Sequence, residues 1–454
     1  MTAPGISIRC RAPPTDTTID TGTIISRSSI DLHPPAERAI LVGAPIKSSR
    51  ARQQLGEHLE ELAELADTAG ATVVGEVTQM LDRPHPGTYL GKGKIEELRG
   101  AIDEQQATVI IFDDELSPAQ GRNVETALNT RVVDRAELIL DIFATRARTS
   151  EAKMQVELAQ LEYTLPRLTR MWTHLEKFRG GIGMRGPGET QLETDRRLIN
   201  NRIKLLKERL VDVTRARVVQ RHSRKGEFRV SLVGYTNAGK SSVLRALAGD
   251  AQVFVEDRLF ATLDPLTREV KLGEHQKALV TDTVGFIRKL PHHLVASFRA
   301  TLEEVNDSDL LLHVIDASRT TWEDQVQVVD GVLAELGVTG KPVLHVFNKI
   351  DQLSHDELLA LQERVRDKYP ESIFVSALAE GGLEPLVRAL VTRVRMLRPI
   401  AEVRIPAGDG RLLAELHRES EVIDQRSEDS VLVLHVRATE ALIGRLKRSG
   451  ATVS

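Results

Sequence analysis

Short apolar runs alternate with amphipathic stretches along residues 36–150. Runs typical of strands lie at Ala39–Val42, Thr72–Val77, Val109–Phe112 and Arg131–Val133. Between them, apolar residues recur every three or four positions, which predicts helices through Leu55, Leu59, Leu62 and Leu65, over Ile95–Ile102 and after Pro118. Strands that alternate with helices in this way predict a small parallel-sheet α/β domain.

Residues 151–226 hold two long helical patterns that are separated by the glycine-rich segment GGIGMRGPG at 180–188. This segment is longer than a plain connector requires, so we predict that it contacts a partner. Pro166 is expected to interrupt the first helix. We predict an antiparallel hairpin in which two apolar stripes bury each other: Met154, Leu158, Leu161, Leu165 and Leu168 in one arm, and Leu192, Ile199, Ile203, Leu206, Leu210 and Val213 in the other.

The rest of the chain divides into three further parts. Residues 227–398 alternate strand and helix again, with strands predicted at Val230–Val233, Ala278–Val280, Leu310–Ile315, Val343–Phe347 and Ile373–Val375. Residues 399–454 predict a small α+β domain, and residues 1–35, which are rich in Thr, Ser, Ile and Pro, predict a mobile tail. The predicted fold class is therefore multidomain α/β.

The composition narrows the class of protein. The 454 residues are 41% apolar and 28% charged, as expected for several folded domains. Cys10 is the single cysteine, which excludes an internal disulfide and a multi-cysteine metal site and favours the cytoplasm. No apolar run approaches the ~18 residues of a membrane span. We expect a cytoplasmic protein, with a peripheral membrane association left open.

Charge is distributed unevenly along the chain. Residues 165–225 contain 16 Lys or Arg and 6 Asp or Glu, a net charge of +10, whereas the whole chain carries −4 and the remainder −14. A basic segment on an otherwise acidic protein favours an anionic polymer as the partner. The alternative is a solvated helix face.

The strand Val230–Val233 runs directly into GYTNAGKS, and the helical pattern Val243–Leu247 follows. This is the context of a P-loop, in which successive backbone N–H groups face a phosphate chain. Lys240 would reach the outer phosphates and the Ser241 hydroxyl would ligate Mg²⁺. The expected nucleotide contacts are Gly234, Tyr235, Thr236, Asn237, Ala238, Gly239, Lys240 and Ser241.

Three later strand ends complete the pattern of a guanine-nucleotide site. The first carries DTVG (Asp282, Thr283, Val284 and Gly285), in which the carboxylate can hold Mg²⁺ through water and the glycine N–H can reach the terminal phosphate. The second carries NKID (Asn348, Lys349, Ile350 and Asp351), whose last carboxylate can accept from both guanine N–H donors and so selects GTP. The third offers the backbone of Ser376, Ala377 and Leu378 to the guanine carbonyl.

Taken together, six motifs resemble the HflX family of ribosome-associated GTPases, in the translation-factor-related class. They are GYTNAGKS, FATLD at 260–264, DTVGF, NKID, GTYLGKGK at 87–94 and GGIGMRGPGETQLETDRR at 180–197. The resemblance covers most of the chain from about residue 38. It implies a protein that hydrolyses GTP to GDP and phosphate with Mg²⁺, and we expect a monomer when free. It also implies binding to the rRNA of the large ribosomal subunit near the peptidyl-transferase region, with splitting or rescue of stalled ribosomes under stress.

Carried over by position, the resemblance also assigns individual residues. Thr262 would be the switch threonine that ligates Mg²⁺ beside Ser241, with Thr267 as the alternative. Catalysis falls to Lys240, Thr262 and Gly285. Further nucleotide contacts are Phe260, Ala261, Thr262, Leu263 and Asp264, and the candidate RNA contacts are Arg179, Arg185, Arg196, Arg197, Arg202 and Lys204.

Several alternatives stay open at this point. Phe286 stands where many small GTPases place a water-orienting glutamine, so we expect slow intrinsic hydrolysis. Asn237 either helps to bind K⁺, as in similar GTPases, or satisfies a loop hydrogen bond. Gly91–Lys94 is either a phosphate site or only a turn and a helix start. The rival functions are an RNA-remodelling or ribosome-assembly GTPase that acts on free rRNA, and a signalling or scaffold GTPase.

Overall fold

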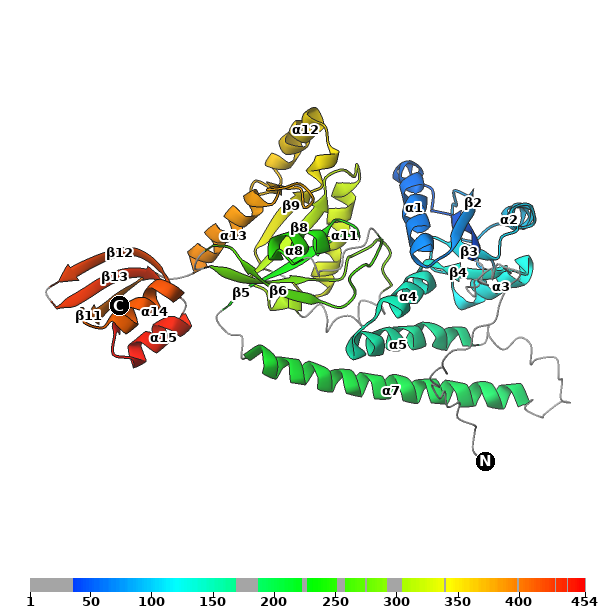
Figure 1. Cartoon of the computed structure of the whole chain (residues 1–454). Helices are drawn as coiled ribbons and strands as arrows, with labels where there is room; N and C mark the ends of the chain where they lie inside the picture. The colour runs from blue at the N-terminus through cyan, green and yellow to red at the C-terminus, as the bar shows by residue number, and fades with distance from the viewer. Residues whose placement is uncertain are drawn as a thin grey trace, which may run out of the picture. The chain divides into compact units, whose positions relative to one another are not determined.

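The computed structural model describes residues 36–168, 187–222, 227–250, 258–273, 276–291, 304–338, 340–397, 400–428, 430–438 and 440–453. These residues form three β-sheets, each with its own helices (Figure 1). The tail 1–35 and residues 180–186 of the tip, with Arg179 and Arg185, lie outside the described residues, so the predictions made for them stay predictions.

The N-terminal sheet is parallel throughout, with the strand order β2-β1-β3-β4. Its strands are β1 (Arg38–Gly43), β2 (Thr72–Thr78), β3 (Val109–Phe112) and β4 (Arg131–Asp134). Alternate residues of β1 point to opposite faces, so Leu41 joins one apolar core and Ile40 the other. The predicted small parallel α/β domain is confirmed.

Helices cover both faces of this sheet. α1 (Ser49–Thr68) and α4 (Arg135–Arg146) pack on one face, and α2 (Lys92–Gln105) and α3 (Pro118–Leu128) pack on the other (Figure 1). α2 begins after Gly91, which agrees with the interpretation of that segment as a turn and a helix start. α4 was not predicted, because seven of its twelve residues are buried and only the narrow polar stripe of Glu137, Asp141 and Thr145 interrupts the apolar run.

The predicted hairpin corresponds to α5 (Ser150–Thr164) and the 36-residue α7 (Pro187–His222), which lie side by side (Figure 1). Pro166 ends the first arm as predicted, because it lies in the 3-10 turn Leu165–Arg167 that follows α5. Mutual burial describes only part of α5. Ala152, Val156, Ala159 and Tyr163 belong to the core of the N-terminal domain, whereas Leu158 of the predicted stripe is buried outside that core.

The second sheet has the order β10-β9-β8-β5-β7-β6 and is parallel except for β6, which pairs antiparallel with β7. Its strands are β5 (Phe228–Gly234), β6 (Leu266–Lys271), β7 (Lys277–Asp282), β8 (Leu310–Asp316), β9 (Val343–Asn348) and β10 (Ile373–Phe374). The described helices around it include α8 (Lys240–Ala248), α11 (Trp322–Glu335), α12 (His355–Arg366) and α13 (Glu384–Leu397). The carboxyl ends of β5, β7, β8 and β9 therefore meet at one edge, where a ligand site is expected.

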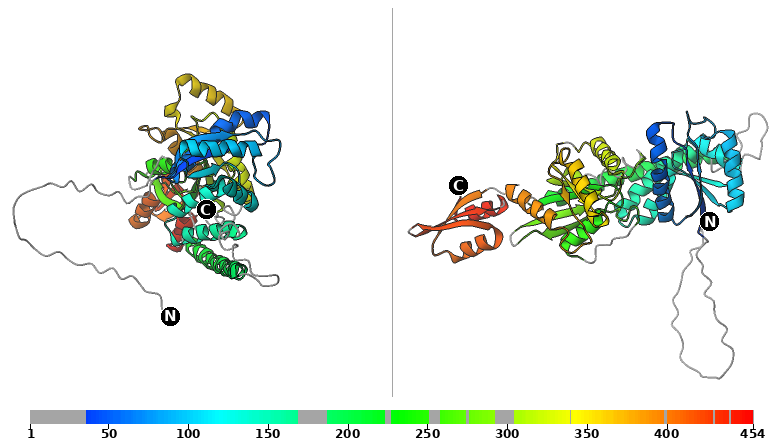
Figure 2. Two further views of the ribbon diagram at one scale, coloured as in Figure 1. Left: turned by 90° about the vertical axis from the view of Figure 1, so that its right-hand side faces the viewer. Right: turned by 90° about the horizontal axis from the view of Figure 1, so that it is seen from above.

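The C-terminal sheet is antiparallel, with the order β12-β13-β11-β14, and two helices pack on one of its faces (Figure 2). Its elements are β11 (Ile400–Pro406), α14 (Gly410–Glu419), β12 (Glu421–Glu428), β13 (Val431–Arg437), α15 (Glu440–Arg448) and β14 (Thr452–Val453). The predicted α+β appendage is confirmed. Among the described residues, no helix combines the length and the apolarity that crossing a membrane requires.

Candidate functional site

The turn between β5 and α8 has the geometry of a phosphate-binding loop. Gly239 has a φ of 91° and lies against Asn348, whose Nδ2 atom would be 2.3 Å from an added Cβ, so a larger residue does not fit. Lys240 is buried, and its Nζ donates to the carbonyl oxygens of Gly234 at 3.1 Å and Tyr235 at 2.7 Å. Burial lowers the pKa of Lys240 to about 8, against the opposing charge of Asp282.

Three oxygen-bearing side chains meet beside this loop. The Ser241 hydroxyl lies 2.6 Å from Asp282 Oδ2 and 2.8 Å from Thr262 Oγ1. Asp282 Oδ1 is buried and has no hydrogen-bond partner among the described residues. Burial raises the pKa of Asp282, although the charge of Lys240 opposes this shift. Two hydroxyls and a carboxylate with an unused oxygen are a donor set that fits Mg²⁺.

Of the two candidate switch threonines, only Thr262 belongs to this oxygen cluster. Thr267 lies on β6, and its hydroxyl pairs with that of Thr281 at 2.9 Å. The other predicted residues of this segment divide between two roles. Ala261 lines a small pocket with Thr262, whereas Leu263 is buried in the core shared with the N-terminal domain. Phe260 also lines the pocket, but its ring packs on Phe143 in that core, with the ring centroids 4.6 Å apart.

Asp264 was predicted to contact nucleotide, and the structure gives its carboxylate a different task. It accepts hydrogen bonds from the backbone N–H groups of Arg148 at 3.0 Å and Thr149 at 3.2 Å, and from the Thr149 hydroxyl. These contacts hold Asp264 at the start of α5, where a helix N-terminus favours a negative charge. The Asp264 carboxylate thus makes an interdomain contact, and the predicted nucleotide contact of this residue stays a prediction.

The DTVG segment continues the pairing of β5 with β7 beyond the strands. Thr236 N–H donates to the Phe286 carbonyl at 2.7 Å, and Phe286 N–H donates to the Gly234 carbonyl at 3.1 Å. Gly285 has no room for a side chain, because a Cβ there would lie 2.8 Å from Thr236 and 3.0 Å from Lys240 Nζ. Thr283 donates its hydroxyl to the Leu232 carbonyl at 2.7 Å, which secures this segment to the central strand.

The NKID segment and the Ser376–Leu378 turn also come together. Asn348 donates to the Ala238 carbonyl at 3.0 Å and accepts from Ala377 N–H at 3.1 Å, so it joins the P-loop to the turn. The Ser376 hydroxyl donates to Asp351 Oδ1 at 2.5 Å and accepts from the backbone of Leu378 at 3.3 Å. The Asp351 carboxylate is thus oriented at the sheet edge.

The structure also contains an ionic cluster that the sequence analysis missed. It comprises Glu61 of α1, Asp113 after β3, Arg135 of α4, and Arg288 and Lys289 just beyond DTVGF. Arg135 is 1% exposed and contacts Glu61, Asp113 at 2.7 Å and the Arg288 carbonyl at 3.1 Å. Burial favours a raised pKa for Asp113, but Arg135, Lys289 and Arg288 outweigh it and lower the value.

Tyr235 of the P-loop joins this cluster directly. Its hydroxyl donates to Glu61 and accepts from the Arg288 N–H at 2.9 Å. One feature of the sequence could have suggested the cluster, because Asp113 and Arg135 each come directly after a buried strand. The pairing itself depends on how α1 and α4 pack beside each other on the N-terminal sheet, which periodicity does not report.

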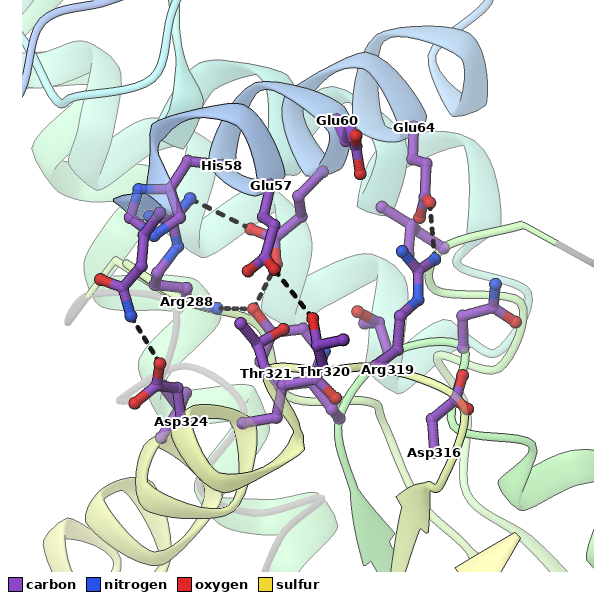
Figure 3. A pocket seen from close by; sticks show the side chains of 18 of the residues that line it. Glu57, His58, Glu60, Glu64, Arg288, Asp316, Arg319, Thr320, Thr321 and Asp324 are labelled. Atoms are coloured by element: carbon purple, nitrogen blue, oxygen red, sulfur yellow. Dashed lines mark hydrogen bonds and ion pairs between the residues drawn. The ribbon is translucent and has the colours of Figure 1, made fainter. Parts of the chain in front are cut away.

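A cavity of about 580 Å³ lies between α1 and the P-loop. Figure 3 shows Glu57, Glu60 and Glu64 of α1 above it and the loop from β8 to α11 below. Glu57 accepts from Thr320 at 3.1 Å, Gln54 donates to Asp324 at 2.5 Å, and Glu64 pairs with Arg319 at 3.0 Å (Figure 3). Burial and the charge of Arg288 lower the pKa of His58 at its rim to about 4.

Three family models match successive parts of the chain. One described as "GTP-binding GTPase N-terminal" matches residues 56–144, and one described as "GTP-binding GTPase Middle Region" matches residues 146–224. A third, described as "50S ribosome-binding GTPase", matches residues 229–349.

Similar proteins and solved structures are known from several organisms. GTPase HflX of Magnetococcus marinus is 47% identical over 92% of this chain and 96% of its own length. GTPase HflX of Escherichia coli is 44% identical over 84% of this chain and 89% of its own length. A GTP-binding protein of Sulfolobus solfataricus, solved with GDP, is 26% identical over 80% of this chain and 99% of that one, with a TM-score of 0.43. The sequence relationships show that the chain belongs to the HflX family of GTPases, enzymes that hydrolyse GTP.

Proposed function

We propose that this GTPase binds the large ribosomal subunit through α7 and that GTP controls this binding, so that the protein splits or rescues stalled ribosomes in the cytoplasm. The observation that carries the proposal is the basic surface of α7. Arg196, Arg197 and Lys204 are exposed on it, within the segment of net charge +10. The family model described as "50S ribosome-binding GTPase" supports the same partner.

Arg202 has a separate role in this surface. Its Nε and Nη2 atoms contact the two carboxylate oxygens of Glu157 on α5, at 2.6 and 2.9 Å. Lys207 similarly pairs with Glu162 at 2.7 Å. Because these cations join the two helices, we propose that Arg202 shapes the arm and that Arg196, Arg197 and Lys204 face rRNA phosphates.

The geometry at the sheet edge supports a nucleotide site there. We propose that Lys240 and the P-loop N–H groups bind the phosphates, that Gly285 contacts the terminal phosphate, and that Asp351 selects guanine. Ser241, Thr262 and Asp282 would hold Mg²⁺, which neutralises phosphate charge when bound. Phe286 is 2% exposed and carries no polar group, so it cannot orient the attacking water, and a partner is needed for fast hydrolysis. K⁺ binding at Asn237 stays a prediction.

Cosedimentation with purified large subunits tests the proposal. We expect association with a non-hydrolysable GTP analogue and little with GDP. The triple variant Arg196→Gln, Arg197→Gln, Lys204→Gln should bind at least tenfold more weakly at low salt. The slope of log K against log salt concentration should become shallower by about 2 to 3. Lys207→Gln is the matched control, because that charge is already paired with Glu162.

Two results would contradict the proposal. Equal association with GTP analogue and GDP would remove nucleotide control. Equal, salt-sensitive binding to protein-free rRNA and to intact subunits would favour the RNA-remodelling function instead.

A further inference from the structure

A buried carboxylate at the end of β8 holds the lysine of the NKID segment. Asp316 is 4% exposed, and its Oδ2 atom lies 2.9 Å from Lys349 Nζ. Its Oδ1 atom accepts from the Ser318 N–H at 3.0 Å and from the Ser318 hydroxyl at 2.6 Å. Both oxygens are therefore engaged, and the carboxylate has a fixed orientation.

Lys349 is held at both ends of its side chain. Its backbone follows β9 directly and has a φ of 65°, a left-handed conformation that is uncommon for a non-glycine residue. Its ammonium group contacts Asp316 on the neighbouring strand, whose register pairs Asp316 with Asn348. The four-carbon stem of Lys349 is therefore fixed at the end of β9 by its backbone and at the end of β8 by its ammonium group.

A second cation that interacts with Asp316 is paired elsewhere. Arg319 follows Asp316 on the same loop, close enough for an electrostatic interaction with it. Its guanidinium contacts Glu64 of α1 at 3.0 Å (Figure 3). This arrangement leaves the Asp316 carboxylate engaged with Lys349.

We propose that Asp316 is a positioning residue for the guanine nucleotide, because it holds the Lys349 stem in place to cover one face of the guanine ring. This inference rests on the proposed guanine site. It adds a residue outside the GYTNAGKS, DTVG and NKID motifs. A stem fixed before the nucleotide arrives loses little conformational entropy on binding, which strengthens binding without contributing to the chemical step.

Binding and release of N-methylanthraniloyl-GDP by the full chain test this role. Asp316→Asn keeps the shape of the side chain and an oxygen for Ser318 but removes the charge that attracts Lys349. We expect the dissociation constant to rise about tenfold, mainly through faster release, whereas kcat at saturating GTP changes less than twofold. Asp309→Asn is the matched control, because Asp309 accepts from Arg229 N–H at the opposite end of β8.

A double-mutant cycle separates positioning from a general loss of structure. Lys349→Met should weaken GDP binding, and adding Asp316→Asn to it should have no further effect. If Asp316→Asn folds poorly, Ser318→Ala provides the second test. It should weaken binding two- to threefold in the parent chain and not at all in the Lys349→Met background.

The outcomes test the proposed guanine site and the positioning role of Asp316 separately. If Lys349→Met leaves the affinity unchanged, the proposed guanine site is wrong. If Lys349→Met weakens binding but Asp316→Asn does not, or if the two effects multiply, the positioning role of Asp316 is overturned and the guanine site stands.

Discussion

Single residues decide which base the proposed site accepts. Asp351 offers two oxygen acceptors, one of which Ser376 orients at 2.5 Å. In Asp351→Asn an amide N–H₂ replaces one acceptor, so a guanine donor loses its partner. We expect the affinity for GDP to fall about a hundredfold or more and that for xanthosine diphosphate to rise. Competition against N-methylanthraniloyl-GDP measures both, with the exposed Asp356→Asn as control, and unchanged GDP affinity would contradict the assignment.

The two candidate switch threonines make opposite predictions. Thr262 lies 2.8 Å from the Ser241 hydroxyl, whereas Thr267 pairs with Thr281 on the neighbouring strand. We expect Thr262→Ala to raise the Mg²⁺ concentration for half-maximal GTP hydrolysis about tenfold, because one oxygen ligand is lost. Thr267→Ala should leave it unchanged. A Mg²⁺ titration of GTPase activity decides between them, and the reverse pattern would restore Thr267 as the ligand.

At this scale, residues that follow short apolar strands were predictable. Parallel strands bring their carboxyl ends to one edge, so Lys240, Asp282 and Asn348 could be placed together from their order alone. Arg135 and Glu61 could not, because their contact depends on how α1 and α4 pack against each other. Asp264 was assigned by its place in a motif, and its actual partner at the start of α5 is 115 residues away in the chain.

At the scale of single elements, β8 contains a buried histidine that makes the stability of the protein depend on pH. His313 on this strand is 1% exposed, and burial, together with His345 and Lys240, lowers its pKa to about 3. In the unfolded chain it titrates near pH 6.5, so its contribution to stability is complete above that pH and is lost progressively toward pH 3. Between pH 7 and pH 5 this loss amounts to about 2 kcal/mol.

The variant His313→Gln should therefore lower stability at pH 7 but flatten its decline toward pH 5. Urea unfolding followed by the fluorescence of Trp322, which packs against the Phe347 ring at 5.2 Å, measures the free energy of unfolding at each pH. His417→Gln, at an exposed position on α14, is the control. An unaltered pH slope in His313→Gln would contradict the prediction.

The elements also show where sequence patterns stop being informative. Helices with one apolar face, such as α1 and α2, were predicted because the opposite face is polar. Most residues of α4 are buried, whereas most residues of β6 and β12 are half-buried or exposed. In all three elements the alternation of apolar and polar residues is therefore too weak to predict the element. α5 was recognised as a helix, but its pattern does not show which neighbour covers its apolar residues.

At the scale of the whole molecule, the ionic cluster is one of the contacts that join the N-terminal domain to the GTPase domain. Arg135→Met would leave Glu61 and Asp113 without their shared buried cation, so we expect a loss of about 3 kcal/mol. Urea unfolding of the full chain followed by circular dichroism measures it, with the exposed Arg122→Met as control. The double variant Arg135→Met, Asp113→Leu should recover part of the loss, and no recovery would show that the charges are not coupled.

The length of α7 determines how far its end moves when the helix turns. Its 36 residues span about 54 Å at 1.5 Å per residue. Its last residue, His222, is six residues from the start of β5, the strand that leads into the P-loop. A helix of this span acts as a lever: a turn of only 10° about that end displaces the opposite end by roughly 9 Å. Movements too small to alter the nucleotide pocket itself would thus be large enough to change which nucleotides of an RNA the arm can reach.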